Sequence, residues 1–166
     1  IIHTRATMEQ RVRAIRTLND AESESIASFK FISSYVEYKN LPELMPKGMT
    51  ENSLTVGYDA SGQVRNVFWS FGKNGTSYSQ NYYLKNGKVY LAKADTYRPA
   101  PKGSNQDDYH VEQKWAFNLQ GNPVNWKPEQ SDPMPDYPLN RETMMRDIER
   151  FIRVAATGGA ERKYKK

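Results

Sequence analysis

The stretch Tyr83-Leu-Lys-Asn-Gly-Lys-Val89 places Asn-Gly between two runs of β-forming residues, which is the chemistry of a tight hairpin turn. The same pattern, an aromatic residue four positions before a glycine, recurs from Tyr58 to Gly62 and from Phe117 to Gly121. Each copy predicts one β-hairpin. The repeat therefore predicts an antiparallel sheet in which the three aromatic residues hold equivalent core positions, and it indicates no chemistry.

The segments around these turns predict about six consecutive strands. We expect the strands at about 53–58, 63–71, 76–84, 88–97, 109–119 and 122–127, with turns at Asp59–Gly62, Gly72–Gly75, Lys85–Gly87 and Gln120-Gly121. An insertion rich in Pro, Gly and Asn, Arg98–Asp108, joins the fourth strand to the fifth. Because the other connections are short, neighbouring strands should pair as a meander.

The N-terminal segment has the pattern of a helix. Residues 7–40 lack Gly and Pro, and apolar residues recur there at three- and four-residue steps. Thr7 with Gln10 forms a capping box, and a break near Asn19 leaves open either two helices or one bent helix. Residues 26–38 also fit the two-residue alternation of a strand, so both interpretations stay open there.

A C-terminal helix is expected between the N-cap Asn140 and about Thr157. The fold class is therefore α+β: an antiparallel meander of about six strands packed on the N-terminal helix or helices and on the C-terminal helix. We expect the helices to cover one sheet face. The single domain spans 1–159, and residues 160–166 are expected to form a basic, disordered tail.

Composition and charge narrow the possible classes of protein. The chain has 166 residues and a formal charge of +5, but residues 161–166 carry four basic and one acidic side chain. The remaining residues carry a formal charge of only +2. Because a nucleic-acid-binding domain carries a basic surface, we expect no nucleic-acid partner. The absence of cysteine excludes disulfides, thiolate zinc sites and thiol catalysis. No apolar run reaches the ~18 residues of a membrane-spanning helix, and no residue spacing indicates a metal or a cofactor.

The segments Tyr82–Tyr90 and Glu112–Gly121, separated by the insertion, resemble small bacterial exported proteins of unassigned function. Those proteins pair an N-terminal helical segment with repeated hairpins of the form aromatic-x-x-x-Gly-Lys-hydrophobic. The resemblance implies export, to the periplasm or out of the cell, and it implies no catalytic residues. A chain that starts at Ile1 rather than Met agrees with a leader or lipoprotein signal that has been removed.

Strand alternation predicts which side chains share a sheet face. In 109–119 the apolar residues fall on one parity, and His110, Glu112 and Lys114 fall on the other. If the aromatic residues of the repeat point inward, parity predicts an open aromatic face that contacts a partner. The alternative is that its rings shield the sheet backbone or contact the insertion. The predicted face contains Phe68, Tyr78, Gln80, Tyr82, Tyr90, His110, Glu112 and Lys114.

Two classes of function remain, with a third behind them. The favoured class is an extracytoplasmic, non-enzymatic binding module, similar to inhibitor or immunity proteins, that engages a protein or glycan partner in the cell envelope. The rival is a cell-envelope hydrolase that uses His110 and Glu112 as acid and base. A structural envelope protein is the third. A deep pocket around His110 would favour the hydrolase, and a flat face would favour binding. The sequence does not indicate the oligomeric state.

Overall fold

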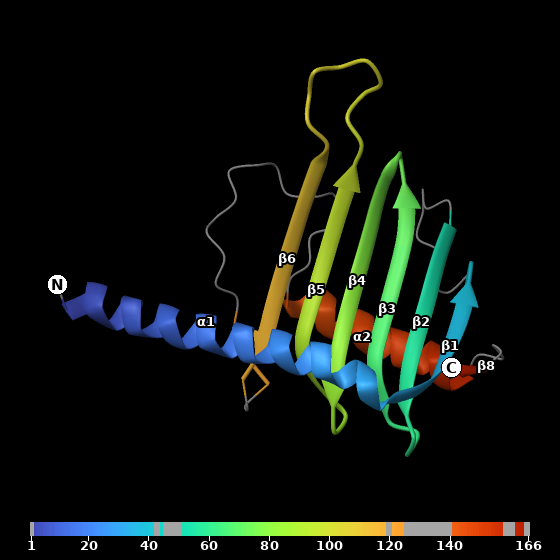
Figure 1. The fold of residues 1–166 in the computed structure, drawn as a ribbon, viewed down its shortest axis with the longest axis horizontal. Coiled ribbons are helices and arrows are strands. Elements are labelled where there is room, and N and C mark those ends of the chain that lie inside the picture. Colours follow the sequence, from blue (N-terminus) through green and yellow to red (C-terminus); the bar gives the residue numbers. More distant parts are fainter. Residues whose placement is uncertain are drawn as a thin grey trace.

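A computed structural model of the chain describes residues 2–41, 44, 51–118, 121–124, 141–157 and 162–164. Its helices are α1 (Ile2–Ser28) and α2 (Arg141–Thr157), and a 3₁₀ turn, η1 (Phe29–Phe31), follows α1 (Figure 1). The strands are β1 (Ile32–Lys39), β2 (Glu51–Asp59), β3 (Val64–Lys73), β4 (Thr76–Lys85), β5 (Lys88–Arg98), β6 (Tyr109–Phe117), β7 (Pro123–Val124) and β8 (Arg162–Tyr164). The protein is therefore α+β, as predicted.

The strands form one sheet in the order β7-β6-β5-β4-β3-β2-β1-β8, and all neighbours are antiparallel. β2 to β7 are adjacent in chain order, which confirms the predicted six-stranded meander. Local turn chemistry accounts for this arrangement. Asn86 and Gly87 both have positive φ, 53° and 76°, as a two-residue type I′ hairpin turn requires. Asn74 and Gly75 repeat this geometry between β3 and β4.

The N-terminal segment differs from the prediction in two ways. α1 is one continuous helix from Ile2, so the capping box at Thr7 and the break near Asn19 are wrong. The helix also ends at Ser28, and Ile32–Lys39 form strand β1, which pairs with β2. Of residues 26–38, the segment 26–31 is therefore helical, and the two-residue alternation is the correct interpretation for 32–38, where every second residue from Ile32 is buried.

The last described residues also differ from the prediction. Arg162–Tyr164 form the edge strand β8, whose backbone pairs with residues 34–36 of β1. This part of the predicted tail therefore belongs to the sheet. Residues 158–161, 165 and 166 lie outside the described residues, and so does the predicted N-cap Asn140.

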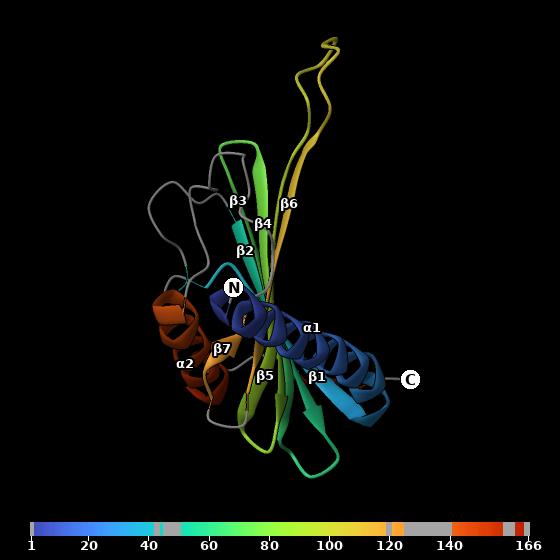
Figure 2. The same ribbon diagram turned by 90° about the vertical axis from the view of Figure 1, so that its left-hand side faces the viewer.

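The two helices cover opposite faces of the sheet (Figure 2). On one face, α2 packs Phe151 against Trp69 and Tyr82, with ring centroids 4.9 and 6.2 Å apart. On the other face, α1 packs Leu18 and Ala21 against a small cluster that contains Tyr83, Leu91 and Ala116. The prediction that the helices share one face is therefore wrong. Adjacent residues such as Tyr82 and Tyr83 are both buried, because each faces a different helix.

The three aromatic residues of the hairpin repeat are not equivalent. Tyr83 faces α1, whereas Tyr58 and Phe117 pack in the core on the α2 side. The connections explain the difference: residues 60–63 join β2 to β3, but only residues 86 and 87 join β4 to β5. The aromatic residue therefore precedes its turn by a different number of strand residues, and strand parity turns it to a different face.

Candidate functional site

α1 lies across only one end of its sheet face and leaves the rest of that face uncovered (Figure 1). We call this uncovered surface the open face. Strand register arranges its residues in three cross-strand rows, which run from β6 toward β1. The row nearest α1 is Lys114, Lys93, Asn81, Phe68, Thr55 and Glu37. The middle row is Glu112, Asp95, Ser79, Ser70, Ser53 and Lys39, and the outer row is His110, Tyr97, Ser77, Gly72 and Glu51.

Small hydroxyl side chains occupy the centre of the open face. Ser53, Ser70 and Ser79 are direct neighbours in the middle row, and each is partly accessible to solvent. Carboxylates on β5 and β6 flank this centre on one side, and Lys39 on β1 flanks it on the other. The open face is therefore shallow and rich in hydrogen-bonding groups, with Phe68 as a partly buried ring at its α1 end.

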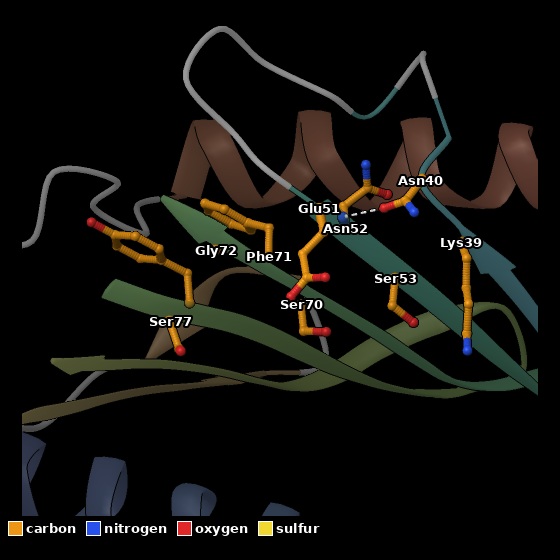
Figure 3. Close-up of a pocket in the computed structure, with 10 residues that line it drawn as sticks. Lys39, Asn40, Glu51, Asn52, Ser53, Ser70, Phe71, Gly72 and Ser77 are labelled. Carbon is orange, nitrogen blue, oxygen red and sulfur yellow. Dashed lines mark hydrogen bonds between the residues drawn. The ribbon is translucent and has the colours of Figure 1, made fainter. Parts of the chain in front are cut away.

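A hollow of about 330 Å³ lies where these small residues meet the ends of β1 to β4. Side chains border it from both sides of the sheet (Figure 3). Lys39, Ser53, Ser70 and Ser77 project toward the α1 side, and Asn40, Asn52 and Phe71 project toward the α2 side. Gly72 lies among them and adds no side chain. The hollow is of the size that accepts a small polar group or one unit of a chain-like ligand.

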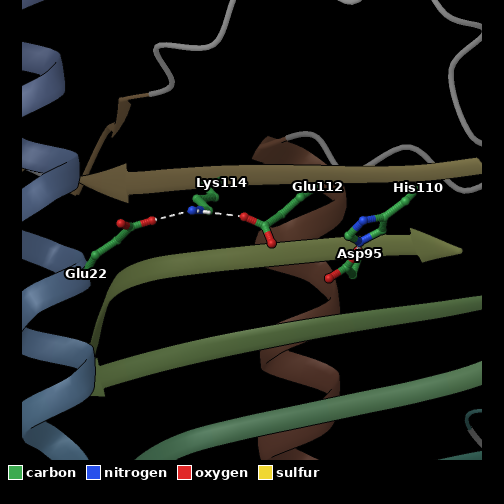
Figure 4. A network of polar contacts seen from close by, with 5 residues as sticks. All are labelled: Glu22, Asp95, His110, Glu112 and Lys114. Atoms are coloured by element: carbon green, nitrogen blue, oxygen red, sulfur yellow. Dashed lines mark hydrogen bonds and ion pairs between the residues drawn. The ribbon is translucent and has the colours of Figure 1, made fainter.

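Lys114 connects the open face to α1 (Figure 4). Its Nζ lies 2.6 Å from Glu22 Oε1 and 2.9 Å from Glu112 Oε1. These hydrogen bonds, first to Glu22 and then to Glu112, raise the pKa of Lys114 above its ordinary value of 10.5. Lys114 is therefore held as a cation that fixes Glu112 on the open face.

His110 pairs with Asp95 through Nε2 and a carboxylate oxygen (Figure 4). The two side chains are 57% and 40% exposed, so the pair lies on the surface of the sheet. Glu112, the predicted partner of His110 in acid–base chemistry, contacts Lys114 instead. Sequence reasoning missed Asp95, because its proximity to His110 depends on the register across the 98–108 insertion.

The structure divides the eight predicted site residues between three places. Phe68, His110, Glu112 and Lys114 lie on the open face. Tyr90 is partly buried in the cluster beside α1. Tyr78, Gln80 and Tyr82 are buried on the α2 side, with 5%, 2% and 1% of their surface exposed.

The predicted aromatic face is therefore wrong, because its parity was taken from Tyr83, which faces α1. Tyr82 and Gln80 instead anchor α2. Tyr82 Oη donates a hydrogen bond to Gln80 Oε1 (2.6 Å), and Gln80 Nε2 donates to Oδ2 of the buried Asp147 (3.4 Å). This network is structural, since it is enclosed between helix and sheet.

Metal binding and membrane crossing find no support in the described residues. No group of three or more His, Cys, Asp or Glu side chains in the described part of the chain is placed to hold a metal ion. Within the same residues, no helix has both the length and the apolar character that crossing a membrane requires. No protein family, curated protein or solved structure matches this chain.

Proposed function

We propose that this protein is a non-enzymatic binding module that holds a hydroxyl-rich glycan on its open face. The observation that carries the proposal is the middle row, in which Ser53, Ser70 and Ser79 form a continuous strip beside the 330 Å³ hollow. Hydroxyl groups donate and accept hydrogen bonds, and the flanking carboxylates accept them. A ligand that carries many hydroxyl groups matches this alternation of donors and acceptors.

The chemistry of the open face favours a glycan over a protein. Protein interfaces are enriched in large aromatic residues and depleted in Ser, Lys and Glu at their centre. The open face has the reverse composition, with Phe68 at one end and Tyr97 at the other as its rings. The hydrogen bonds of a glycan, direct or through bridging water, can be made at a polar surface such as this one.

The exposed His110–Asp95 pair supports a second candidate, a hydrolase acting on the same glycan. An imidazole beside a carboxylate can act as a general base. Both groups are exposed on the sheet surface, however, and neither lines the hollow, whereas enzyme sites are concave pockets with convergent polar groups. Binding without cleavage is therefore the function that this geometry supports better.

The experiment is a calorimetric titration of the protein with a panel of soluble cell-envelope oligosaccharides. We expect at least one of them to bind, and we expect Ser70→Tyr, which fills the hollow, to weaken binding by about tenfold or more. Gln63→Tyr in the β2–β3 turn is the matched control and should bind as the wild type does. Tight binding by Ser70→Tyr, or binding of a protein but of no oligosaccharide, would refute the proposal.

The same samples separate the binding module from the hydrolase. The bound oligosaccharide should be recovered intact by mass spectrometry after prolonged incubation. Release of shorter products that stops in His110→Ala would establish the hydrolase instead.

The proposal places the partner in the cell envelope, because the resemblance to exported proteins implies export. Fractionation of cells that express the full-length natural gene tests the location. Recovery of the protein in the periplasm or the medium agrees with the proposal, and recovery in the cytoplasm contradicts it.

A further inference from the structure

α1 exposes large apolar residues to solvent, which an ordinary surface helix would bury. Its buried residues are small: Ala14, Ala21, Ser25 and Ser28. Leu18 is the large apolar residue that packs on the sheet. Four others are exposed instead, with 59% of Met8, 48% of Val12, 43% of Ile15 and 74% of Ile26 accessible to solvent. An amphipathic helix normally buries its large apolar residues, so this arrangement marks a surface that is covered by a partner.

The exposed residues follow the spacing of a coiled coil. Positions 8, 12, 15, 19, 22 and 26 alternate steps of four and three, as the a and d positions of a heptad do. At 100° per residue they fall within about 80° of the helix circumference. They are Met8, Val12, Ile15, Asn19, Glu22 and Ile26, and we call them the α1 stripe. Glu22, at the margin of the stripe, is partly buried and pairs with Lys114 on β6.

The first half of α1 also extends past β6 (Figure 1), beyond which the sheet has only the two-residue edge strand β7 among the described residues. A short helix without tertiary contacts is marginal in water, because nucleation is costly. In α1 the second half packs on the sheet, so the helix is already nucleated when a partner contacts the first half. Contact along the projecting half would therefore add stability at little entropic expense.

We propose that the α1 stripe is the interface of a homodimer, in which α1 packs antiparallel on α1 of a second copy. The two-fold axis passes between Val12 and Ile15, so that Val12 of each copy meets Ile15 of the other. Met8 of each copy then lies beside Asn19 of the other, toward the two ends of this central contact. An open hollow of about 560 Å³ beside Met8, Glu9, Val12 and Arg13 leaves room for side chains of the second helix.

The charged residues beside the α1 stripe favour this register over the alternative registers. In the proposed register, Glu9 of each copy faces Arg16 of the other, which gives two opposite-charge pairs. A shift by one heptad in one direction sets Arg16 against Arg16, and a shift in the other direction sets Glu9 against Glu9. A parallel pair sets Arg11 against Arg16. The alternatives each place like charges together, which costs free energy.

The two charged residues used in the test, Glu9 and Arg16, lie on α1 outside the rows of the open face. The dimer is tested by sedimentation equilibrium of the wild type over a range of concentrations, with Glu9→Arg and Arg16→Glu as variants. We expect the wild type to form a dimer. We expect the dimer dissociation constant of each variant alone to be about tenfold or more higher, because the dimer of either variant contains two like-charge pairs. An equimolar mixture of the two variants should recover the dimer, since both pairs are then complementary. Lys88→Glu, a charge reversal at the exposed first residue of β5, is the control.

The outcomes separate this interface from other occupants. A monomeric wild type overturns the proposal, and so does a dimer that neither charge variant weakens. If the monomer instead floats with vesicles of phosphatidylcholine and phosphatidylglycerol, the α1 stripe meets an anionic membrane surface and the dimer is wrong. Oligosaccharide binding by the charge variants should match the wild type in every case, so failure of the dimer is distinguishable from failure of the glycan site.

Discussion

Lys114 on β6 lies 2.6 Å from Glu22 on α1, so a single ammonium group joins the helix to the open face. The same ammonium lies 2.9 Å from Glu112, which keeps that carboxylate in place on the face. Removal of the Lys114 ammonium would therefore weaken the attachment of α1 to the sheet and leave Glu112 without this cation on the open face.

The stability that Lys114 contributes should depend on pH. The pKa of Lys114 is raised in the folded protein above its ordinary value of 10.5, so its contribution is present in full below about 10.5 and is lost as pH rises through the folded pKa. We expect Lys114→Met to lower the free energy of unfolding by roughly 1 kcal/mol at pH 8. In urea unfolding the difference from the wild type should shrink above pH 10.5, and a difference that stays constant to higher pH would show that charge is not its origin.

Tyr82 should behave as a core residue. Because it is 1% exposed and contacts Phe151, Tyr82→Ser should lower the free energy of unfolding by about 3–5 kcal/mol. Tyr82→Phe should cost about 1–2 kcal/mol, because Gln80 Oε1 then loses its donor. Tyr97→Ser on the exposed end of β5 is the comparison and should cost less than about 1 kcal/mol. Equal effects of the two serine variants in chemical denaturation would contradict this placement of Tyr82.

Gly57 on β2 leaves room for the side chains of Ile32 and Tyr35 on β1. A Cβ atom at this position would lie 3.2 Å from side-chain atoms of Ile32 and Tyr35, closer than ordinary contact. We expect Gly57→Ala to lower the free energy of unfolding by about 1–3 kcal/mol through overpacking. Ser77→Ala, at an exposed strand position, should be neutral. If the melting temperature of Gly57→Ala equals that of the wild type, the side chains of Ile32 and Tyr35 can shift to admit the methyl group without cost.

The β2–β3 turn is held by one carboxylate. Asp59 Oδ1 accepts hydrogen bonds from Ser61 Oγ (2.6 Å), Ser61 N (3.0 Å) and Gln63 N (3.0 Å), and these lower the pKa of Asp59 below 3.8. The resulting stability is present above pH 3.8 and is lost as pH falls through the folded pKa. Asp59→Ala should therefore cost about 1 kcal/mol at pH 7. Acid titration monitored by circular dichroism should show the two proteins converging at low pH, and divergence there would contradict this account.

Local chemistry explains what the sequence predicted well. Asn86-Gly87 and Asn74-Gly75 specify their hairpins through their own backbone preferences, and the meander follows from them. The two faces of the sheet could not be predicted in this way, because a one-residue difference in parity exchanges them. Tyr82 and Tyr83 show the difficulty: both are buried aromatic residues, and only the position of two helices distant in sequence decides which face each one takes.

The candidate site was only half predictable for the same reason. His110, Glu112 and Lys114 alternate along one strand, so their common face was visible in the sequence. Asp95 and Ser70 join them only through the pairing of β3 to β6. The apolar residues of α1 indicated a helix correctly, but periodicity cannot tell whether a sheet or a second molecule covers the apolar side.

The most direct test of the account is an NMR titration of ¹⁵N-labelled protein with the oligosaccharide that binds best. The account predicts chemical-shift changes concentrated on the middle row of the open face, at Ser53, Ser70, Ser79 and Asp95, with little change around Phe151 under α2. Changes confined to the α2 side, or no changes with any oligosaccharide, would contradict it.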